Sequence, residues 1–167
     1  AIAEGGRPGP ALVDLPKDVQ QALCETPRSW RAECEVMPSP SPASIEEAER
    51  LIAASTRPLF YLGGGIARSN ASEMIRRIVE ESGIPAVATL QGLGVLPPEH
   101  PAMLGMLGMH GHRAANMAVQ DSDLLIVVGA RFDDRATGKL AEFAPHASVV
   151  HIDVDAAELG KLRFAHA

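Results

Sequence analysis

The chain has 167 residues, of which 46% are hydrophobic and 22% charged, a composition typical of a folded globular domain. The formal net charge is -6 and the basic residues are scattered, which argues against a nucleic-acid partner. The longest apolar run, residues 124–128, is too short to cross a bilayer, so we expect no membrane span.

The start of the chain lacks the basic and apolar stretches of a secretory signal, so we expect a protein that is not secreted. The missing initiator Met leads us to expect a piece of a longer protein. Two cysteines, Cys24 and Cys34, are too few for a disulfide framework or a zinc site, and they favour a reducing compartment.

The N-terminal region has the pattern of a domain end followed by a linker. Residues 10–16 form a short apolar segment closed by proline, which predicts a strand. Prolines at 38, 40 and 42 remove backbone donors and favour extended conformations before them, so we expect neither helix nor sheet there. We therefore predict the tail of a preceding domain over 1–21, a linker over 22–43 and a separate domain over 44–167.

Helices and apolar strands alternate in the predicted domain. Ser44, with Glu47 three residues later, predicts a capping box that opens a helix reaching about Ser55. Strands are expected over 58–62, 84–88, 123–128 and 148–154, and helices over 69–81 and 111–120, while the weak periodicity of 136–143 is left open. Apolar strands separated by helices predict an α/β, Rossmann-like doubly wound fold with a parallel sheet covered on both faces.

In such sheets, ligands bind beyond the carboxyl ends of the strands, and unusual residues follow several predicted strands. The glycine triplet at 63–65 follows the first strand, and a backbone without Cβ atoms can approach a phosphate. The triplet is not a G-x-G-x-x-G fingerprint, and the acidic residue expected about 20 positions later is absent. A tight strand-to-helix turn is the alternative explanation.

Charged residues follow the third and fourth predicted strands. Arg131 and Arg135 surround two carboxylates and can bind phosphate or carboxylate groups, although a self-satisfied cluster of ion pairs is the alternative. Asp153 can accept hydrogen bonds from ribose hydroxyls or cap the turn that contains Glu158.

A segment rich in glycine and methionine lies between the second and third predicted strands. It contains His110 and His112, but no third ligand with suitable spacing is evident, so we predict no metal site. A flexible backbone against a flat ligand, with Met109 as a polarisable contact, competes with the alternative of plain core methionines.

Two longer strings carry a resemblance to a known family. Residues 104–111 and 123–139 closely resemble the catalytic subunits of acetohydroxyacid (acetolactate) synthases, which are thiamine-diphosphate enzymes. Residues 6–18 resemble the end of that family's pyrimidine-binding domain, and the glycine triplet and 151–155 fall in the right order. The resemblance covers nearly the whole chain and is weakest over 22–44.

The resemblance implies a central domain that binds FAD in an extended pose, with no net redox role for the flavin. Arg135 is implied to bind the carboxylate of a second 2-ketoacid, with Met109 and Asp134 nearby. The residues implied to line the flavin nucleotide are Arg7, Gly63, Gly64, Gly65, Thr89, Leu90, Gln91, Met109, His110, Gly111, Gly129, Ala130, Arg131, Asp133 and Asp153.

The whole-enzyme reaction implied by the resemblance decarboxylates pyruvate and joins the remaining two-carbon unit to pyruvate or 2-ketobutyrate, in branched-chain amino-acid synthesis. The activating glutamate and the site for thiamine diphosphate and Mg²⁺ belong to flanking domains of the family, so we predict no catalytic residue here and an inactive piece. Implied partners are the remaining domains of the chain, a homodimer or homotetramer of catalytic subunits, and a small regulatory subunit. The implied location is a bacterial cytoplasm, or a plastid or mitochondrion.

Three alternatives stay open beside this interpretation. An NAD-dependent oxidoreductase or deacylase domain has a similar fold, but it usually carries a dinucleotide fingerprint that the glycine triplet does not supply. A structural module that has lost its ligand is less compatible with the intact 131–135 string. Glyoxylate carboligase and pyruvate oxidase are related enzymes whose central domains compete more closely.

Overall fold

The computed structural model describes residues 3–25 and 39–167, and the chain divides into two compact units, Ala1–Ser39 and Pro40–Ala167. The described part of the first unit runs without regular structure as far as a short helix, α1 (Lys17–Gln21). The predicted strand over 10–16 is therefore wrong. A strand needs a neighbour for its backbone groups, and no described segment pairs with this one.

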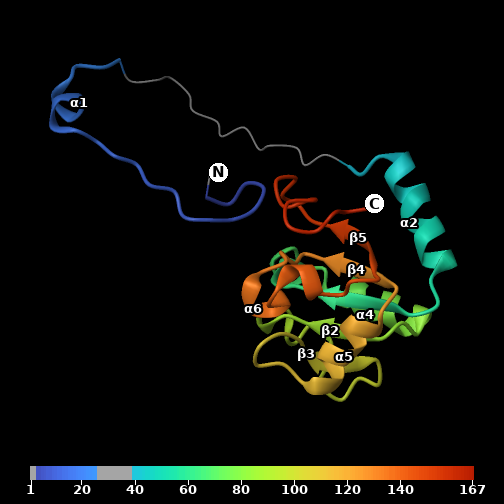
Figure 1. Ribbon diagram of the computed structural model, residues 1–167. Coiled ribbons are helices and arrows are strands. Elements are labelled where there is room, and N and C mark those ends of the chain that lie inside the picture. The colour runs from blue at the N-terminus through green and yellow to red at the C-terminus, as the bar shows by residue number, and fades with distance from the viewer. Residues whose placement is uncertain (1–2, 26–38) are drawn as a thin grey trace. The chain divides into compact units, whose positions relative to one another are not determined.

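The second unit is built on a five-stranded parallel sheet (Figure 1). The strands are β1 (Pro58–Leu62), β2 (Ala86–Ala88), β3 (Met103–Met106), β4 (Leu124–Val128) and β5 (Ser148–Ile152), in the order β3-β2-β1-β4-β5. All four neighbouring pairs are parallel, so the predicted doubly wound α/β fold is confirmed. The chain moves outward from β1 to β3 and then returns to β4, which places the topological switch point between β1 and β4.

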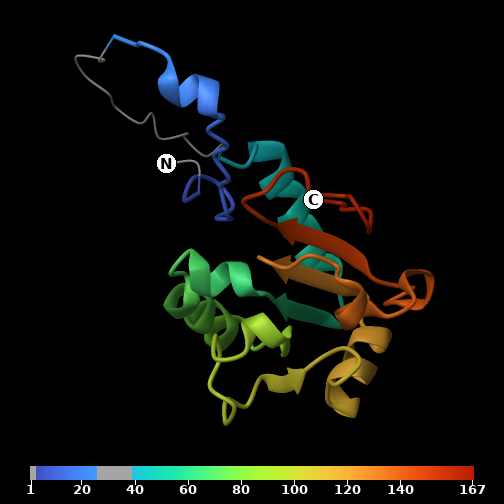
Figure 2. The same cartoon turned by 90° about the vertical axis from the view of Figure 1, so that its left-hand side faces the viewer.

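Helices cover both faces of this sheet. One face packs against α2 (Pro42–Ala54), α3 (Gly64–Arg68) and α4 (Ser72–Ser82), and the other packs against α5 (Arg113–Asp121) and the segment that contains α6 (Asp134–Thr137). Short 3-10 turns lie at Leu90–Gly92 and Leu140–Glu142. Helix α2 lies alongside β5 at the edge of the sheet (Figures 1 and 2).

Apolar runs form the inner strands because both sides of the sheet are covered. In β1, Leu59 and Tyr61 join the core beneath α5, whereas Phe60 and Leu62 join the core beneath α3 and α4. All four side chains are buried. This explains why the strand is continuously apolar rather than alternating.

The predicted capping box at Ser44 is wrong. Helix α2 begins earlier, with Ser41 as its N-cap, because the Ser41 hydroxyl oxygen accepts a hydrogen bond from the Ser44 N–H at 3.1 Å. Pro42 occupies the first turn, where its missing N–H would have had no helical partner. The expectation that Pro42 cannot belong to a helix is therefore wrong.

Other helix and strand boundaries also differ from the predicted ones. Helices α4 and α5 begin at Ser72 and Arg113, two or three residues later than predicted, and β5 ends at Ile152 rather than at 154. Strand β3 was not predicted, because Gly105 with φ +104 interrupts a weak pattern for a strand. Within residues 3–25 and 39–167, the helices include none with the length and apolar character that a membrane crossing requires.

Candidate functional site

The loops that leave β1 and β4 meet at the switch point through their glycines. The Gly63 N–H donates to the Val128 carbonyl and the Gly65 N–H donates to the Gly129 carbonyl, each at 2.9 Å. A Cβ on Gly63 would lie 2.2 Å from the Gly129 oxygen, and one on Gly65 would lie 2.7 Å from the Gly129 Cα. Backbone packing therefore accounts for glycine at 63 and 65 without a ligand, as the tight-turn alternative supposed.

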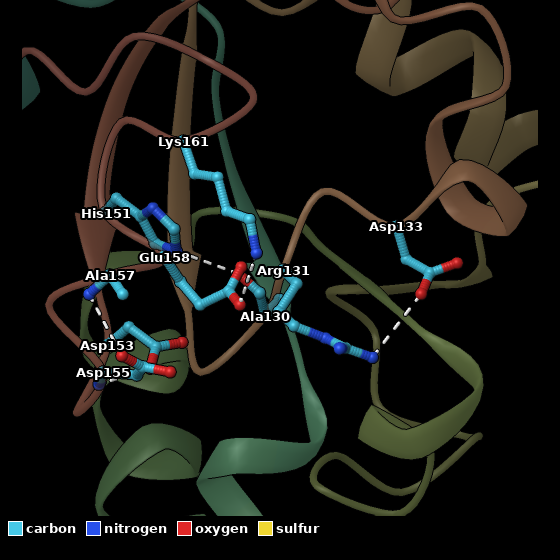
Figure 3. A network of polar contacts seen from close by, with 9 residues as sticks. All are labelled: Ala130, Arg131, Asp133, His151, Asp153, Asp155, Ala157, Glu158 and Lys161. Atoms are coloured by element: carbon cyan, nitrogen blue, oxygen red, sulfur yellow. Dashed lines mark hydrogen bonds and ion pairs between the residues drawn. The ribbon is translucent and has the colours of Figure 1, made fainter.

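Arg131 lies just beyond this contact, with a guanidinium that faces solvent. Its side chain is 51% exposed, and Nη2 lies 3.5 Å from Asp133 Oδ2 (Figure 3). An ion pair this long and this exposed contributes little to stability. The guanidinium is therefore placed to exchange this partner for an anionic group of a ligand.

Asp133 has a structural task of its own. Its carboxylate caps α6 by accepting a hydrogen bond from the Arg135 N–H at 3.1 Å. That bond and the nearby guanidinium of Arg131 hold the pKa of the Asp133 carboxyl below its usual value. The 131–135 cluster is thus partly self-satisfied, and Asp133 is its best-partnered member.

The segment between β3 and α5 lies against the 131–135 loop. The Met109 N–H donates to the Arg135 carbonyl at 3.0 Å, and a Cβ on Gly108 would lie 2.5 Å from the same carbonyl oxygen. Met109 itself is 64% exposed, so it is not a core methionine. The structure thus brings Met109 and Arg135 together, from segments 26 positions apart in the sequence.

Asn116 holds this segment in place, and sequence analysis missed it. Its Oδ1 accepts from the Gly108 N–H at 2.8 Å, and its Nδ2 donates to the Gly108 carbonyl at 3.0 Å. Gly108 has φ +97, so the two bonds pin a backbone conformation that favours glycine. A polar residue on a helix is no signal by itself, because an exposed helix face has the same pattern.

Acidic residues gather beyond β5, next to the loop that follows β4 (Figure 3). Asp153 Oδ1 accepts from the Asp155 N–H at 2.9 Å, and Glu158 pairs with Lys161 at 3.1 Å. Residues 156–160 form turns rather than a helix, and the Ala157 N–H in that segment donates to Asp155 Oδ1 at 3.0 Å. Asp155 therefore caps the turn that contains Glu158, and the alternative that assigned this cap to Asp153 is wrong.

The remaining predicted residues divide into packed and exposed ones. Thr89 follows β2, where its N–H donates to the Leu62 carbonyl at 2.9 Å, and Leu90 and Gln91 next to it are exposed. Gly111 packs against the Met106 carbonyl, while His110 is exposed. Arg7 belongs to the first unit, and its contact with the flavin nucleotide stays a prediction.

The described ranges, 3–25 and 39–167, contain no group of three or more His, Cys, Asp or Glu side chains that could hold a metal ion. Cys24 is exposed, and Cys34 lies outside the described residues. What the carboxyl edge offers is recognition: a guanidinium, carboxylates and exposed apolar side chains on adjacent loops.

His151 is a second residue that sequence analysis passed over. It lies in β5, is only 6% exposed, and its Nε2 is 2.9 Å from the Ala130 carbonyl oxygen. A histidine inside an otherwise apolar strand was the signal that could have found it.

Comparison with known proteins identifies the family of the chain. A family model for the central domain of thiamine pyrophosphate enzymes matches residues 45–167. Acetolactate synthase isozyme 2 large subunit of Escherichia coli (strain K12) is 50% identical over 165 residues, covering 99% of this chain and 30% of that protein. An acetolactate synthase of Mycobacterium bovis is 51% identical over 169 residues, covering 98% and 27%.

A plant relative agrees with the bacterial ones. Acetolactate synthase 1, chloroplastic, of Zea mays is 48% identical over 171 residues, covering 99% of this chain and 26% of that protein. The chain thus spans less than a third of the length of each of these three relatives. Since the family model covers most of its residues, the chain belongs to the central-domain family of thiamine pyrophosphate enzymes.

Proposed function

We propose that this chain is the FAD-binding central domain of an acetolactate synthase large subunit. The observation that carries the proposal is the convergence of exposed charged and apolar side chains at one edge of the sheet, around its switch point. Arg131 follows β4, Asp153 follows β5, Leu90 follows β2 and Met109 follows β3. Four loops far apart in the sequence thus supply one surface, at the place where doubly wound sheets bind nucleotides.

The chemistry of these groups fits an extended flavin nucleotide. The half-exposed guanidinium of Arg131 suits a pyrophosphate, because its planar fork matches phosphate oxygens. The carboxylate of Asp153 suits ribose hydroxyls as an acceptor. Leu90 and Met109, which are 68% and 64% exposed, suit the apolar face of a flat ring system. The flavin is proposed as a structural cofactor without net redox work.

The catalytic activity is proposed for the longer protein. The relatives named acetolactate synthase are more than three times as long as this chain, which spans 26–30% of them. In the proposed reaction, pyruvate loses carbon dioxide and its two-carbon unit joins a second 2-ketoacid, with thiamine diphosphate and Mg²⁺ bound outside this domain. Arg135 would hold the carboxylate of that second ketoacid, beside Met109 and Asp134.

Assembly and location follow the same proposal. The domain would work together with the rest of its own chain, in a homodimer or homotetramer of large subunits with a small regulatory subunit. Two of the relatives are named as large subunits, which supports the proposal that this domain belongs to a large subunit. A bacterial cytoplasm or a plastid is the proposed location, and a chloroplastic relative supports the second.

Calorimetric titration of the 167-residue chain with FAD, NAD and ADP tests the cofactor. We expect FAD to bind best. Arg131→Ala should weaken that binding by about 1.5–3 kcal/mol, the range for a hydrogen bond to a charged group. Arg77→Ala is the matched control, because Arg77 is also an exposed arginine paired with a carboxylate but lies on α4.

Three outcomes of this titration would contradict the proposal in different ways. Equal binding of ADP and FAD would leave only the adenylate half of the site in this chain. Preference for NAD would favour an oxidoreductase domain instead. Equal losses in Arg131→Ala and Arg77→Ala would remove Arg131 from the site.

The ketoacid role needs the longer protein. There, Arg135→Ala should leave FAD content unchanged and raise the KM for the second ketoacid, because the guanidinium is proposed to orient that substrate and not the flavin. Lost flavin with normal acceptor kinetics would reverse the roles of Arg131 and Arg135.

A further inference from the structure

His151 contacts the chain at the point where β4 becomes the Arg131 loop. In the sheet His151 pairs with Val127, and its side chain reaches beyond the end of β4 to the carbonyl of Ala130 (Figure 3). A carbonyl oxygen can only accept, so Nε2 must carry the proton of this 2.9 Å hydrogen bond. The imidazole thus supplies a donor where the backbone ladder of β4 has ended.

The same ring also touches the residue on the other side of Arg131. The His151 and Phe132 rings meet edge to face with centroids 5.5 Å apart. Ala130 and Phe132 are both buried, whereas Arg131 between them is half exposed. One buried side chain therefore holds both neighbours of the exposed arginine.

A histidine at this position lowers the stability of the fold in one respect. Its Nδ1 is buried and has no hydrogen-bond partner in the part of the chain that the structure describes. An unsatisfied buried acceptor costs stability, and an apolar side chain of similar shape would avoid that cost. The donor at Nε2 is what an apolar side chain could not replace.

We infer that His151 is a positioning residue for Arg131. By fixing the Ala130 carbonyl and packing on Phe132, it sets the backbone from which the guanidinium reaches the ligand edge. This keeps the orientation of Arg131 from being lost to local motion of the loop, so less ordering is needed when a ligand binds. The identity of that ligand as FAD rests on the proposed function, but the positioning of Arg131 does not.

Limited trypsin digestion of the 167-residue chain tests the positioning without any ligand. His151→Leu keeps apolar bulk and loses the donor, whereas His151→Gln keeps an N–H the same number of bonds from the backbone. Cleavage after Arg131 should become about fivefold faster or more in His151→Leu, since losing one hydrogen bond raises the open population by about that factor. His151→Gln should restore slow cleavage, and cleavage after Arg77 should not change in either variant.

Equal acceleration after Arg77 and Arg131 would mean a general loss of stability and would overturn the inference, as would unchanged cleavage in His151→Leu. If His151→Leu does not fold, the pair His151→Gln and His151→Asn decides the matter. The side-chain N–H of asparagine is one bond closer to the backbone than that of glutamine, so it does not reach the Ala130 carbonyl. Cleavage after Arg131 should therefore accelerate only in the asparagine variant.

A double-mutant cycle for FAD affinity adds the functional readout. His151→Leu should weaken binding about tenfold alone and add almost nothing in the Arg131→Ala background, because it acts through that side chain. Losses that multiply would show that His151 acts independently of Arg131, against the inference. If the unaltered chain binds no FAD, the cofactor proposal fails for this chain while the digestion still decides the role of His151.

Discussion

The two edges of the sheet carry charged residues that are treated in opposite ways. At the amino edge, Asp123 precedes β4, and its carboxylate accepts hydrogen bonds from the Ser55 hydroxyl, from the Thr56 N–H and hydroxyl at 2.8 and 2.7 Å, and from the Arg57 N–H at 2.9 Å. These bonds tie the segment before β1 to the start of β4. At the carboxyl edge, Arg131 has a 3.5 Å ion pair and faces solvent.

The pKa of the Asp123 carboxyl reflects how completely its charge is satisfied. Partial burial would raise the pKa of the Asp123 carboxyl, but the hydrogen bonds from Ser55, Thr56 and Arg57 outweigh it and hold the pKa well below the usual range. A charge that is saturated with protein donors stabilises the fold, whereas a charge left to solvent is ready for a ligand. Asp123 at the amino edge and Arg131 at the carboxyl edge therefore differ in how completely the protein itself satisfies their charges.

The largest effect on stability is expected at the backbone contact between glycines at the carboxyl edge. Gly129 has φ +57, and a Cβ there would lie 2.7 Å from the Gly65 Cα. Gly129→Ala should lower the free energy of unfolding by about 2–5 kcal/mol, from backbone strain plus overpacking. Denaturant titration measures it.

Gly83→Ala is the control for that prediction. Gly83 has φ +66 at the end of α4 and open space around the position of a Cβ, so only the strain of about 1–2 kcal/mol should appear. Equal losses in the two variants would mean that the loop contact adds nothing.

Asp123→Ala should cost about 1.5–3 kcal/mol of unfolding free energy, because it removes a charged acceptor shared by several donors. Asp121→Asn, at an exposed position at the end of α5, should stay within about 0.5 kcal/mol of the unaltered chain. A small loss in Asp123→Ala would erase the contrast between the two edges.

The stabilisation by Asp123 should also depend on pH in a defined direction. Its folded pKa lies below the unfolded value, so its contribution is complete above the unfolded pKa of about 3.9 and is lost as pH falls toward the folded pKa. The stability gap between the unaltered chain and Asp123→Asn should be constant from about pH 5 to 7 and shrink below about pH 4. A gap that widens in acid would contradict the assigned cause.

Asn116→Ala should cost about 1–2 kcal/mol, since it removes two neutral hydrogen bonds to the Gly108 backbone. Asn116→Asp keeps the acceptor and loses the donor, so its loss of unfolding free energy should lie between zero and that of Asn116→Ala. Hydrogen exchange at the Met109 amide, which bonds the Arg135 carbonyl, should accelerate more in Asn116→Ala than exchange in β1. Uniform acceleration would indicate a global effect and no local clamp.

The smallest effect on stability is expected for Arg131→Ala. A half-exposed ion pair contributes little, so the free energy of unfolding should change by less than about 0.5 kcal/mol, while affinity for FAD falls. A loss of stability as large as that of Asp123→Ala would make Arg131 a structural residue and would remove the distinction between the edges.

Patterns within a single element were enough to predict β1, β2, β4 and β5, but not β3. The apolar runs at 58–62 and 124–128 predicted buried parallel strands, because burial on both faces demands continuous apolar sequence. The same reasoning placed Arg131 and Asp153 at strand ends, and hence at one edge of the sheet. Local signals were less secure at boundaries, since Ser41 and Ser44 both satisfy the rule for an N-cap and only the backbone shows which one is used.

Contacts between distant segments were decided by the tertiary structure. The glycines at 63 and 65 are explained by Gly129, more than 60 positions away, and no spacing rule links them. The roles of Asn116 and His151 likewise depend on carbonyls and amides brought to them by other elements. The sequence by itself determined which segments of the second unit are buried, because burial there follows from side-chain chemistry. Which backbone groups lack a partner, and which side chain satisfies them, is fixed only when the strands are stacked side by side.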